Sequence, residues 1–162
     1  MSRYTRAGLL KRSILLFWSV WITTVVLMNV GDALKVVGVL PSGWKLASGN
    51  YQAIVDAAAV YGTPHWLDLL LFFGAILWET AAMLLFWVAT RRYRSGGSHH
   101  ERAMYLAFTA LFALYATFIL ADEFFHEYRM EGDHRGIAIL LLASLLALQL
   151  LPDRSTHHRT EQ

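Results

Sequence analysis

The sequence predicts an all-α integral membrane protein built as a bundle of four helices. Of its 162 residues, 56% are hydrophobic and only 16% are charged, whereas about a quarter of a soluble domain is charged. The apolar residues also gather into four long runs, and a helix that crosses a bilayer needs about 20 mostly apolar residues. No linker or repeat divides the chain, so residues 1–162 are expected to form one membrane domain.

The first run, SILLFWSVWITTVVLMNV, follows a leader with four basic residues. It is too long for the apolar part of a signal peptide, and no A-x-A-like cleavage site follows it. We therefore expect an uncleaved anchor that spans residues 13–34. The second predicted span, residues 66–90, ends in the basic segment RRYRSGG, whose glycines predict a turn.

The third span is predicted over residues 103–121 and the fourth over residues 135–151. The apolar part of the fourth, Ile137–Leu151, has only 15 residues, and Pro152 ends it. At about 1.5 Å per residue this stretch is short for a bilayer core of about 30 Å. We therefore expect this helix to take in part of Asp133–Gly136, or to cross a thin region of bilayer.

The basic residues predict the orientation. Four spans place both termini on one side, together with the 91–102 loop. Ten of the 14 Lys and Arg residues fall on that side: Arg3, Arg6, Lys11, Arg12, Arg91, Arg92, Arg94, Arg102, Arg154 and Arg159. Positive charge is enriched on the cytoplasmic side, so both termini are expected in the cytoplasm and the protein in the inner or plasma membrane. These segments are short and adjoin the spans, which favours anionic lipid over nucleic acid as their partner.

A long outer loop, Lys35 to His65, joins the first two spans. Within it, NYQAIVDAAAVYGTP predicts a short amphipathic helix, because Ser48 or Asn50 suits its start and Gly62 with Pro64 suits its end. Residues at three- and four-residue spacing give this helix one apolar stripe: Tyr51, Ile54, Val55, Ala58 and Tyr61. The stripe is a candidate for facing a partner subunit, for packing on the bundle, or for lying on the lipid surface.

In these features the chain resembles a family of predicted small integral membrane proteins, domain of unknown function 2165. The resemblance covers most of the chain and rests on the four spans, the long first outer loop and a set of short motifs in a fixed order. These are Asn29 and Asp32 at the end of the first span, YQAI in the loop, WE at Trp78–Glu79, DEFF from Asp122, and LPD after the fourth span. The resemblance implies an architecture and no activity.

Polar residues gather where the spans reach the outer side. The hairpin of the second and third spans brings His65 to the depth of Asp122, Glu123 and His126. These four residues are candidate metal ligands, because carboxylates and imidazoles at helical spacing converge. The mixture does not select one metal, and a haem held by two of the histidines is a further alternative. The same residues are also what a solvated helix end or a partner-docking surface contains.

Glu79 lies about 13 residues after Trp66, hence roughly 20 Å along the second span and near mid-bilayer. An ionisable group at that depth faces the bundle interior or a cavity and is a functional hypothesis by default. One interpretation is a protonated carboxyl bonded across helices to a depth-matched group: Thr23, Thr24, Tyr115 or Thr117. The alternative is proton or quinone chemistry.

The sequence contains no P-loop, no dinucleotide-binding fingerprint, no serine-elbow motif and no other complete catalytic motif. We therefore expect a non-catalytic accessory or anchoring subunit of a larger membrane assembly, such as a respiratory or redox complex, with other membrane subunits and the bilayer as partners. Two alternatives remain. One is a metal- or haem-binding redox enzyme with its site on the outer side, and the other is a proton or ion conduit centred on Glu79.

Overall fold

The computed structural model describes residues 3–95 and 100–152, and the regular structure in these two stretches is entirely helical. The elements follow in the order α1 (Arg3–Val36), α2 (Asn50–Ala58), η1 (Ala59–Tyr61), α3 (His65–Ser95), α4 (His100–Phe125) and α5 (Tyr128–Leu150). The predicted turn at Gly96 and Gly97 and the basic residues Arg154 and Arg159 lie outside the described residues.

Four helices, α1, α3, α4 and α5, are each long and apolar enough to cross a membrane. Large apolar side chains such as Leu27, Leu77 and Leu120 are exposed on the outside of the bundle, where lipid rather than water suits them. The all-helical fold with four long apolar helices is therefore confirmed, and it fits a small multi-pass membrane protein. The cytoplasmic location of the termini stays a prediction.

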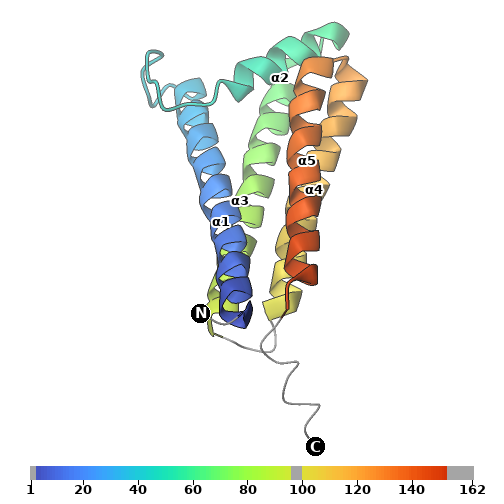
Figure 1. Cartoon of the computed structure of the whole chain (residues 1–162). Coiled ribbons are helices and arrows are strands. Elements are labelled where there is room, and N and C mark those ends of the chain that lie inside the picture. Colours follow the sequence, from blue (N-terminus) through green and yellow to red (C-terminus); the bar gives the residue numbers. More distant parts are fainter. Residues whose placement is uncertain (1–2, 96–99, 153–162) are drawn as a thin grey trace, which may run out of the picture.

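The long helices pack in sequence order, with α3 between α1 and α4, and with α5 on α4. Helices α1 and α5 contact each other at few positions, and they diverge toward one end of the bundle (Figure 1). Helix α2 crosses the bundle at that end, which we call the α2 end. The first turn of α1 and the last turn of α5 lie at the opposite end (Figure 1).

The centre of the bundle combines aromatic rings with small residues. Trp18 of α1 and Phe86 of α3 have ring centroids 6.3 Å apart, and Phe108 of α4 lies 5.1 Å from Phe86. Four buried alanines belong to the same cluster: Ala82, Ala89, Ala103 and Ala107. Small residues let membrane helices approach closely, and large rings then fill the remaining space. The core therefore joins α1, α3 and α4.

The last helix differs from its predicted span. Helix α5 begins at Tyr128, seven residues before the predicted start at residue 135, and has 23 residues. At about 1.5 Å per residue it is roughly 34 Å long, which is long enough to cross a bilayer core of about 30 Å without thinning. The charged stretch around Asp133 continues the helix, because its side chains bond within the α4–α5 hairpin, as described below.

A short helix forms in the long loop, but its N-cap is Gly49, with a left-handed φ of +77°, and not the predicted Ser48 or Asn50. Helix α2 starts at Asn50, whose backbone N–H donates to Ser48 Oγ at 3.2 Å. The 3₁₀ turn η1 follows, and it ends at Gly62, which has a left-handed φ of +60°. Pro64 then precedes α3. Turn chemistry of this kind is local, which is why the sequence alone locates it.

Candidate functional site

Several buried polar side chains lie in the half of the bundle nearer the α2 end, where they join elements that are distant in the sequence. They are Asn29 and Asp32 on α1, Asp68 and Glu79 on α3, and Asp122 on α4. A buried polar group is costly unless it is hydrogen-bonded. The hydrogen-bond partners of these five side chains therefore show which elements they hold together.

Glu79 bonds to α1 rather than to any of the partners expected from its depth. Asn29 Nδ2 donates to Glu79 Oε2 at 2.7 Å, and Asn50 Nδ2 at the start of α2 donates to Asn29 Oδ1 at 2.8 Å. A bonded chain therefore runs from a buried carboxyl in α3, across α1, to an exposed residue of α2. An amide group can donate one hydrogen bond while it accepts another, and it does not ionise. Asn29 and Asn50 therefore form a continuous chain of bonds that holds the Glu79 carboxyl in place.

The three threonine hydroxyl groups expected near Glu79 are engaged elsewhere. Thr23 Oγ1 accepts a hydrogen bond from Trp87 Nε1 at 2.9 Å, while Thr24 and Thr117 donate to backbone carbonyls of their own helices. Threonine in a helix commonly bonds to the carbonyl four residues earlier. The sequence does not rank Asn29 above these groups, because Asn29 lies at the end of the first apolar run and Glu79 lies in the middle of the second.

Two further carboxyl groups fix the ends of the α2 segment. Asp32 Oδ2 accepts hydrogen bonds from the Tyr51 backbone N–H at 2.9 Å and from Ser48 Oγ at 3.3 Å. Asp68 Oδ1 accepts a hydrogen bond from Thr63 Oγ1 at 2.8 Å. Asp32 thus anchors the start of α2 to α1, and Asp68 anchors the segment after η1 to α3.

The predicted apolar stripe of α2 contacts the bundle through its two tyrosines and Ala58. The Tyr51 ring packs on Phe72 with centroids 5.4 Å apart, and its hydroxyl lies 3.0 Å from His65 Nδ1. Burial and the nearby Asp68 carboxylate raise the pKa of the Tyr51 phenol, so the hydroxyl keeps its proton. Ala58 is buried.

At the far end of this segment, the Tyr61 hydroxyl donates to the Phe124 backbone carbonyl at 2.8 Å. Its ring also lies against Phe124 and Phe125 of α4. Helix α2 and η1 therefore connect α1 to α4 across the α2 end. The remaining stripe residues, Ile54 and Val55, are half-buried, and a partner subunit on them stays a prediction.

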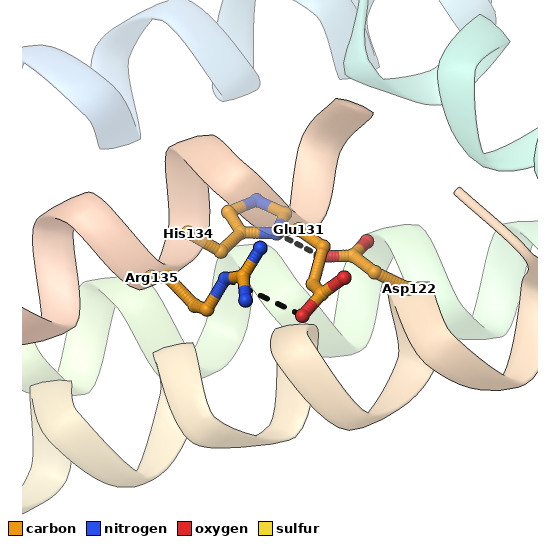
Figure 2. A network of polar contacts seen from close by, with 4 residues as sticks. All are labelled: Asp122, Glu131, His134 and Arg135. Carbon is orange, nitrogen blue, oxygen red and sulfur yellow. Dashed lines mark hydrogen bonds and ion pairs between the residues drawn. The ribbon is translucent and has the colours of Figure 1, made fainter. Parts of the chain in front are cut away.

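The α4–α5 hairpin contains a carboxylate–imidazole pair that the sequence did not indicate. His134 Nδ1 lies 2.5 Å from Asp122 Oδ2, and Figure 2 shows the two side chains pointing toward each other from α5 and α4. The imidazole packs on the rings of Tyr115 and Phe118, at 5.8 Å and 5.1 Å. An ionised Asp122 accepts a hydrogen bond from a protonated Nδ1. In the neutral imidazole, Nε2 then keeps its lone pair and can accept a hydrogen bond.

Next to this pair, Arg135 Nε lies 3.4 Å from Glu131 Oε1 one turn earlier in α5 (Figure 2). The arginine is largely exposed. Both residues belong to α5, so this pair bonds within one helix, whereas the Asp122–His134 pair joins α4 to α5.

The turn between α4 and α5 separates the residues that were candidate metal ligands. His126 has a left-handed φ of +62°. The N–H of His126 bonds to the Glu123 carbonyl, and the N–H of Glu127 bonds to the Asp122 carbonyl at 2.8 Å. These two bonds form a Schellman motif. The helix therefore stops at Phe125, and His126 does not continue the helical face of Asp122.

The four candidate ligands are consequently engaged in different places. His65 bonds to Tyr51, Asp122 bonds to His134, and Glu123 and His126 are exposed. Among residues 3–95 and 100–152, no group of three or more His, Asp or Glu side chains is arranged to hold a metal ion. A ligand set drawn from these four residues requires them to move from the positions described.

The position of His134 relative to the turn between α4 and α5 is the one sequence feature that indicates its contact with Asp122. Asp122 and His134 lie on either side of the turn at His126, and two antiparallel helices joined by a short turn bring such positions together. The sequence alone does not single out His134, because the predicted fourth span begins at residue 135. Comparison with models of protein families, with curated proteins and with solved structures gave no match.

Proposed function

We propose that this small multi-pass membrane protein is a non-catalytic accessory or anchoring subunit of a larger membrane complex. A respiratory or other redox complex is the assembly that we expect. The resemblance to the domain of unknown function 2165 family is part of this proposal, and it concerns architecture alone.

The observation that carries the proposal is the use of the buried carboxyl groups. Asp32 bonds to Ser48 and to the start of α2, and Asp68 bonds to Thr63. The other two carboxyl groups, Glu79 and Asp122, bond to Asn29 and His134 on neighbouring helices. Each group thus holds one part of the chain against another, which is what a scaffold requires.

The test is isolation of the native protein in mild detergent, followed by identification of every co-purifying chain, metal and pigment. We expect one or more other membrane proteins in a fixed ratio to this chain. A preparation that contains this chain alone, with a stoichiometric metal or a haem absorption band, contradicts the proposal and supports the redox alternative.

A matched pair of variants on α2 makes the test more specific. Ile54→Glu places a charge in the predicted partner-facing stripe, whereas Gln52→Glu changes an exposed position of the same helix. Loss of the co-purifying chain from the first variant alone, with both proteins folded, is the expected result. Equal retention of the partner by both variants contradicts a role for the stripe.

A proton or ion conduit centred on Glu79 is the second candidate. The observation that favours it is a buried carboxyl group fourteen residues after the start of α3, within a helix that can cross the membrane. The groups that link this carboxyl to the exposed end of the bundle are the amides of Asn29 and Asn50. Because amides do not exchange protons readily, the accessory role is preferred.

A further inference from the structure

The segment after α1 turns back along the helix that it leaves. The backbone N–H groups of Val39 and Leu40 both donate to the Leu34 carbonyl, at 2.8 and 3.0 Å. Further on, the Ser48 N–H donates to the Met28 carbonyl at 3.1 Å. Met28 lies eight residues before the end of α1, about 12 Å down the helix. We call residues 37–47, which form this return, the hook.

The hook has apolar side chains that this chain does not cover. The exposed fractions are 56% for Val37, 67% for Val39, 43% for Trp44 and 64% for Leu46. The indole N–H of Trp44 donates to the Leu46 carbonyl at 3.2 Å, so its polar atom is bonded within the hook. Exposed apolar side chains at adjoining positions in a non-helical segment mark an interaction surface.

The hook lies against the last turns of a membrane helix. A side chain at Gly31 would place its Cβ 2.2 Å from the Leu46 carbonyl oxygen, which means that the hook backbone rests directly on α1 there. Leu27, one turn before Gly31 on the same face, is exposed on the outside of the bundle. The lipid-facing surface of α1 therefore continues into the hook.

The chemistry of the hook limits the depth at which it lies. Irregular backbone does not face the hydrocarbon core, because its unpaired N–H and C=O groups lack water there. The boundary between headgroups and acyl chains satisfies both requirements, since it admits apolar side chains and hydrates the backbone. Lys35 lies two residues before the hook and Lys45 lies within it, and both supply cations at the level of the lipid phosphates.

We propose that the hook is a lipid-binding anchor. Val39, Trp44 and Leu46 insert among the acyl chains at the interface, while Lys35 and Lys45 bind phosphate groups of phospholipids. The partner is the lipid surface beside α1 rather than another protein. This proposal stands independently of the accessory role, because it requires only that α1 crosses the membrane.

The test uses nitroxide labels on single cysteines, which is direct because the chain has no cysteine. Labels are placed at Val39 and Leu46, with Gln52 on the exposed side of α2 as control, in vesicles of phosphatidylethanolamine and phosphatidylglycerol. Oxygen concentrates in the bilayer, and a nickel chelate stays in water. We expect the hook labels to collide mainly with oxygen and the Gln52 label mainly with nickel.

Two outcomes overturn the proposal. Nickel collision at Val39 and Leu46 equal to that at Gln52 places the hook in water, and exclusion of both reagents places it under protein. A label at Val37 replaces either site if a variant fails to fold. Substituting Lys35→Gln and Lys45→Gln together is expected to make the hook labels shallower, and an unchanged depth removes the lysines from the proposal.

Discussion

At the scale of single residues, the hydrogen bonds in the bundle interior join polar side chains, which are rare in apolar membrane helices. Asn29 and Glu79 are both buried and bond to each other across α1 and α3. The Asn29 amide supplies the donor that the buried Glu79 carboxyl needs, and the carboxyl supplies the acceptor. The presence of each polar residue in the bundle interior is therefore explained by the other.

The first prediction concerns this pair. Glu79→Gln keeps an acceptor oxygen for Asn29 Nδ2 and is expected to fold with stability close to that of the natural chain. Glu79→Leu removes the acceptor and leaves the amide unpaired. Hydrogen bonds between membrane helices average about 0.6 kcal/mol and reach about 1.7 kcal/mol, so a loss in that range is expected in a detergent unfolding titration.

The control is the double-mutant cycle with Asn29→Leu. If the bond contributes as described, the double variant is less destabilised than the sum of the two single variants. Strict additivity would show that the pair has no coupling. Full assembly of Glu79→Gln with loss of a measured transport or redox activity would instead support the proton-conduit alternative, because glutamine cannot ionise.

His126 provides the second prediction, since it occupies the left-handed position of the Schellman motif. This conformation costs an L-residue roughly 1–2 kcal/mol of strain. Glycine removes that strain, but its larger loss of backbone entropy on folding offsets part of the gain. His126→Gly is therefore expected to raise stability by up to about 1 kcal/mol, and His126→Val to lower it. Thermal unfolding of the two variants in detergent measures both.

The same variant separates the turn from a metal site. A metal ligand at His126 requires the glycine variant to lose bound metal and the stability that the metal provides. Elemental analysis of His126→Gly beside the natural chain measures this directly, and loss of a stoichiometric metal contradicts the purely conformational role.

At the scale of elements, the third prediction compares two glycines in helices. Gly31→Ala places a methyl group against the Leu46 carbonyl, so the hook must shift away from α1. Gly74 of α3 has nothing within 4 Å of the corresponding position, and alanine there improves helix propensity by about 1 kcal/mol. We expect Gly31→Ala to lose stability and Gly74→Ala to keep or gain it. Equal effects in thermal unfolding would show that the hook does not rest on α1.

The fourth prediction concerns the link between α4 and α5. His134→Phe keeps the ring packing on Tyr115 and Phe118 but removes the bond to Asp122, which leaves a buried acceptor without its partner. Such a loss costs roughly 1–3 kcal/mol. Glu131→Gln removes only the charge of the pair with Arg135, which lies within α5 and whose arginine is largely exposed, and is expected to cost well under about 1 kcal/mol. A larger effect of Glu131→Gln in the same unfolding assay contradicts this order.

The sequence predicted the existence of the elements better than their ends. Apolar runs and the turn residues Gly62 and Pro64 are local signals, and they located the long helices and the short one. The start of α5 was not predictable in this way, because Gly132, Asp133 and Gly136 have low helix propensity and the charged residues between Tyr128 and Gly136 lie outside the apolar run. The Asp122–His134 bond, a contact between two elements, outweighs that preference.

At the scale of the whole molecule, the fifth prediction tests the orientation. Cysteines at Ser95, at the end of α3, and at Gln52, on α2, are expected to react with a membrane-impermeant reagent from opposite sides. In intact cells only the Gln52→Cys variant should be labelled, because the basic segments are expected in the cytoplasm. Labelling of Ser95→Cys alone reverses the orientation, and labelling of both removes the four-span arrangement.

The hydrogen bonds of the polar interior were only partly predictable, because the ends of the helices are uncertain from the sequence. The sequence singled out Glu79 and Asp122 as unusual, since a carboxyl group next to or within an apolar run is visible without a structure. It did not pair them with Asn29 and His134. Pairing depends on the relative vertical shift of two helices, and apolar runs with uncertain ends leave that shift open by several residues.

The order in which the helices pack also bears on how the protein is made. Trp18, Phe86 and Phe108 belong to α1, α3 and α4, so the aromatic centre is complete before α5 leaves the ribosome. The last helix then packs mainly on α4, the helix synthesised immediately before it, and their bond joins residues twelve positions apart. Domains form from the N-terminus during synthesis, and short sequence separations favour fast pairing. For this chain we therefore expect the order of assembly to follow the order of translation.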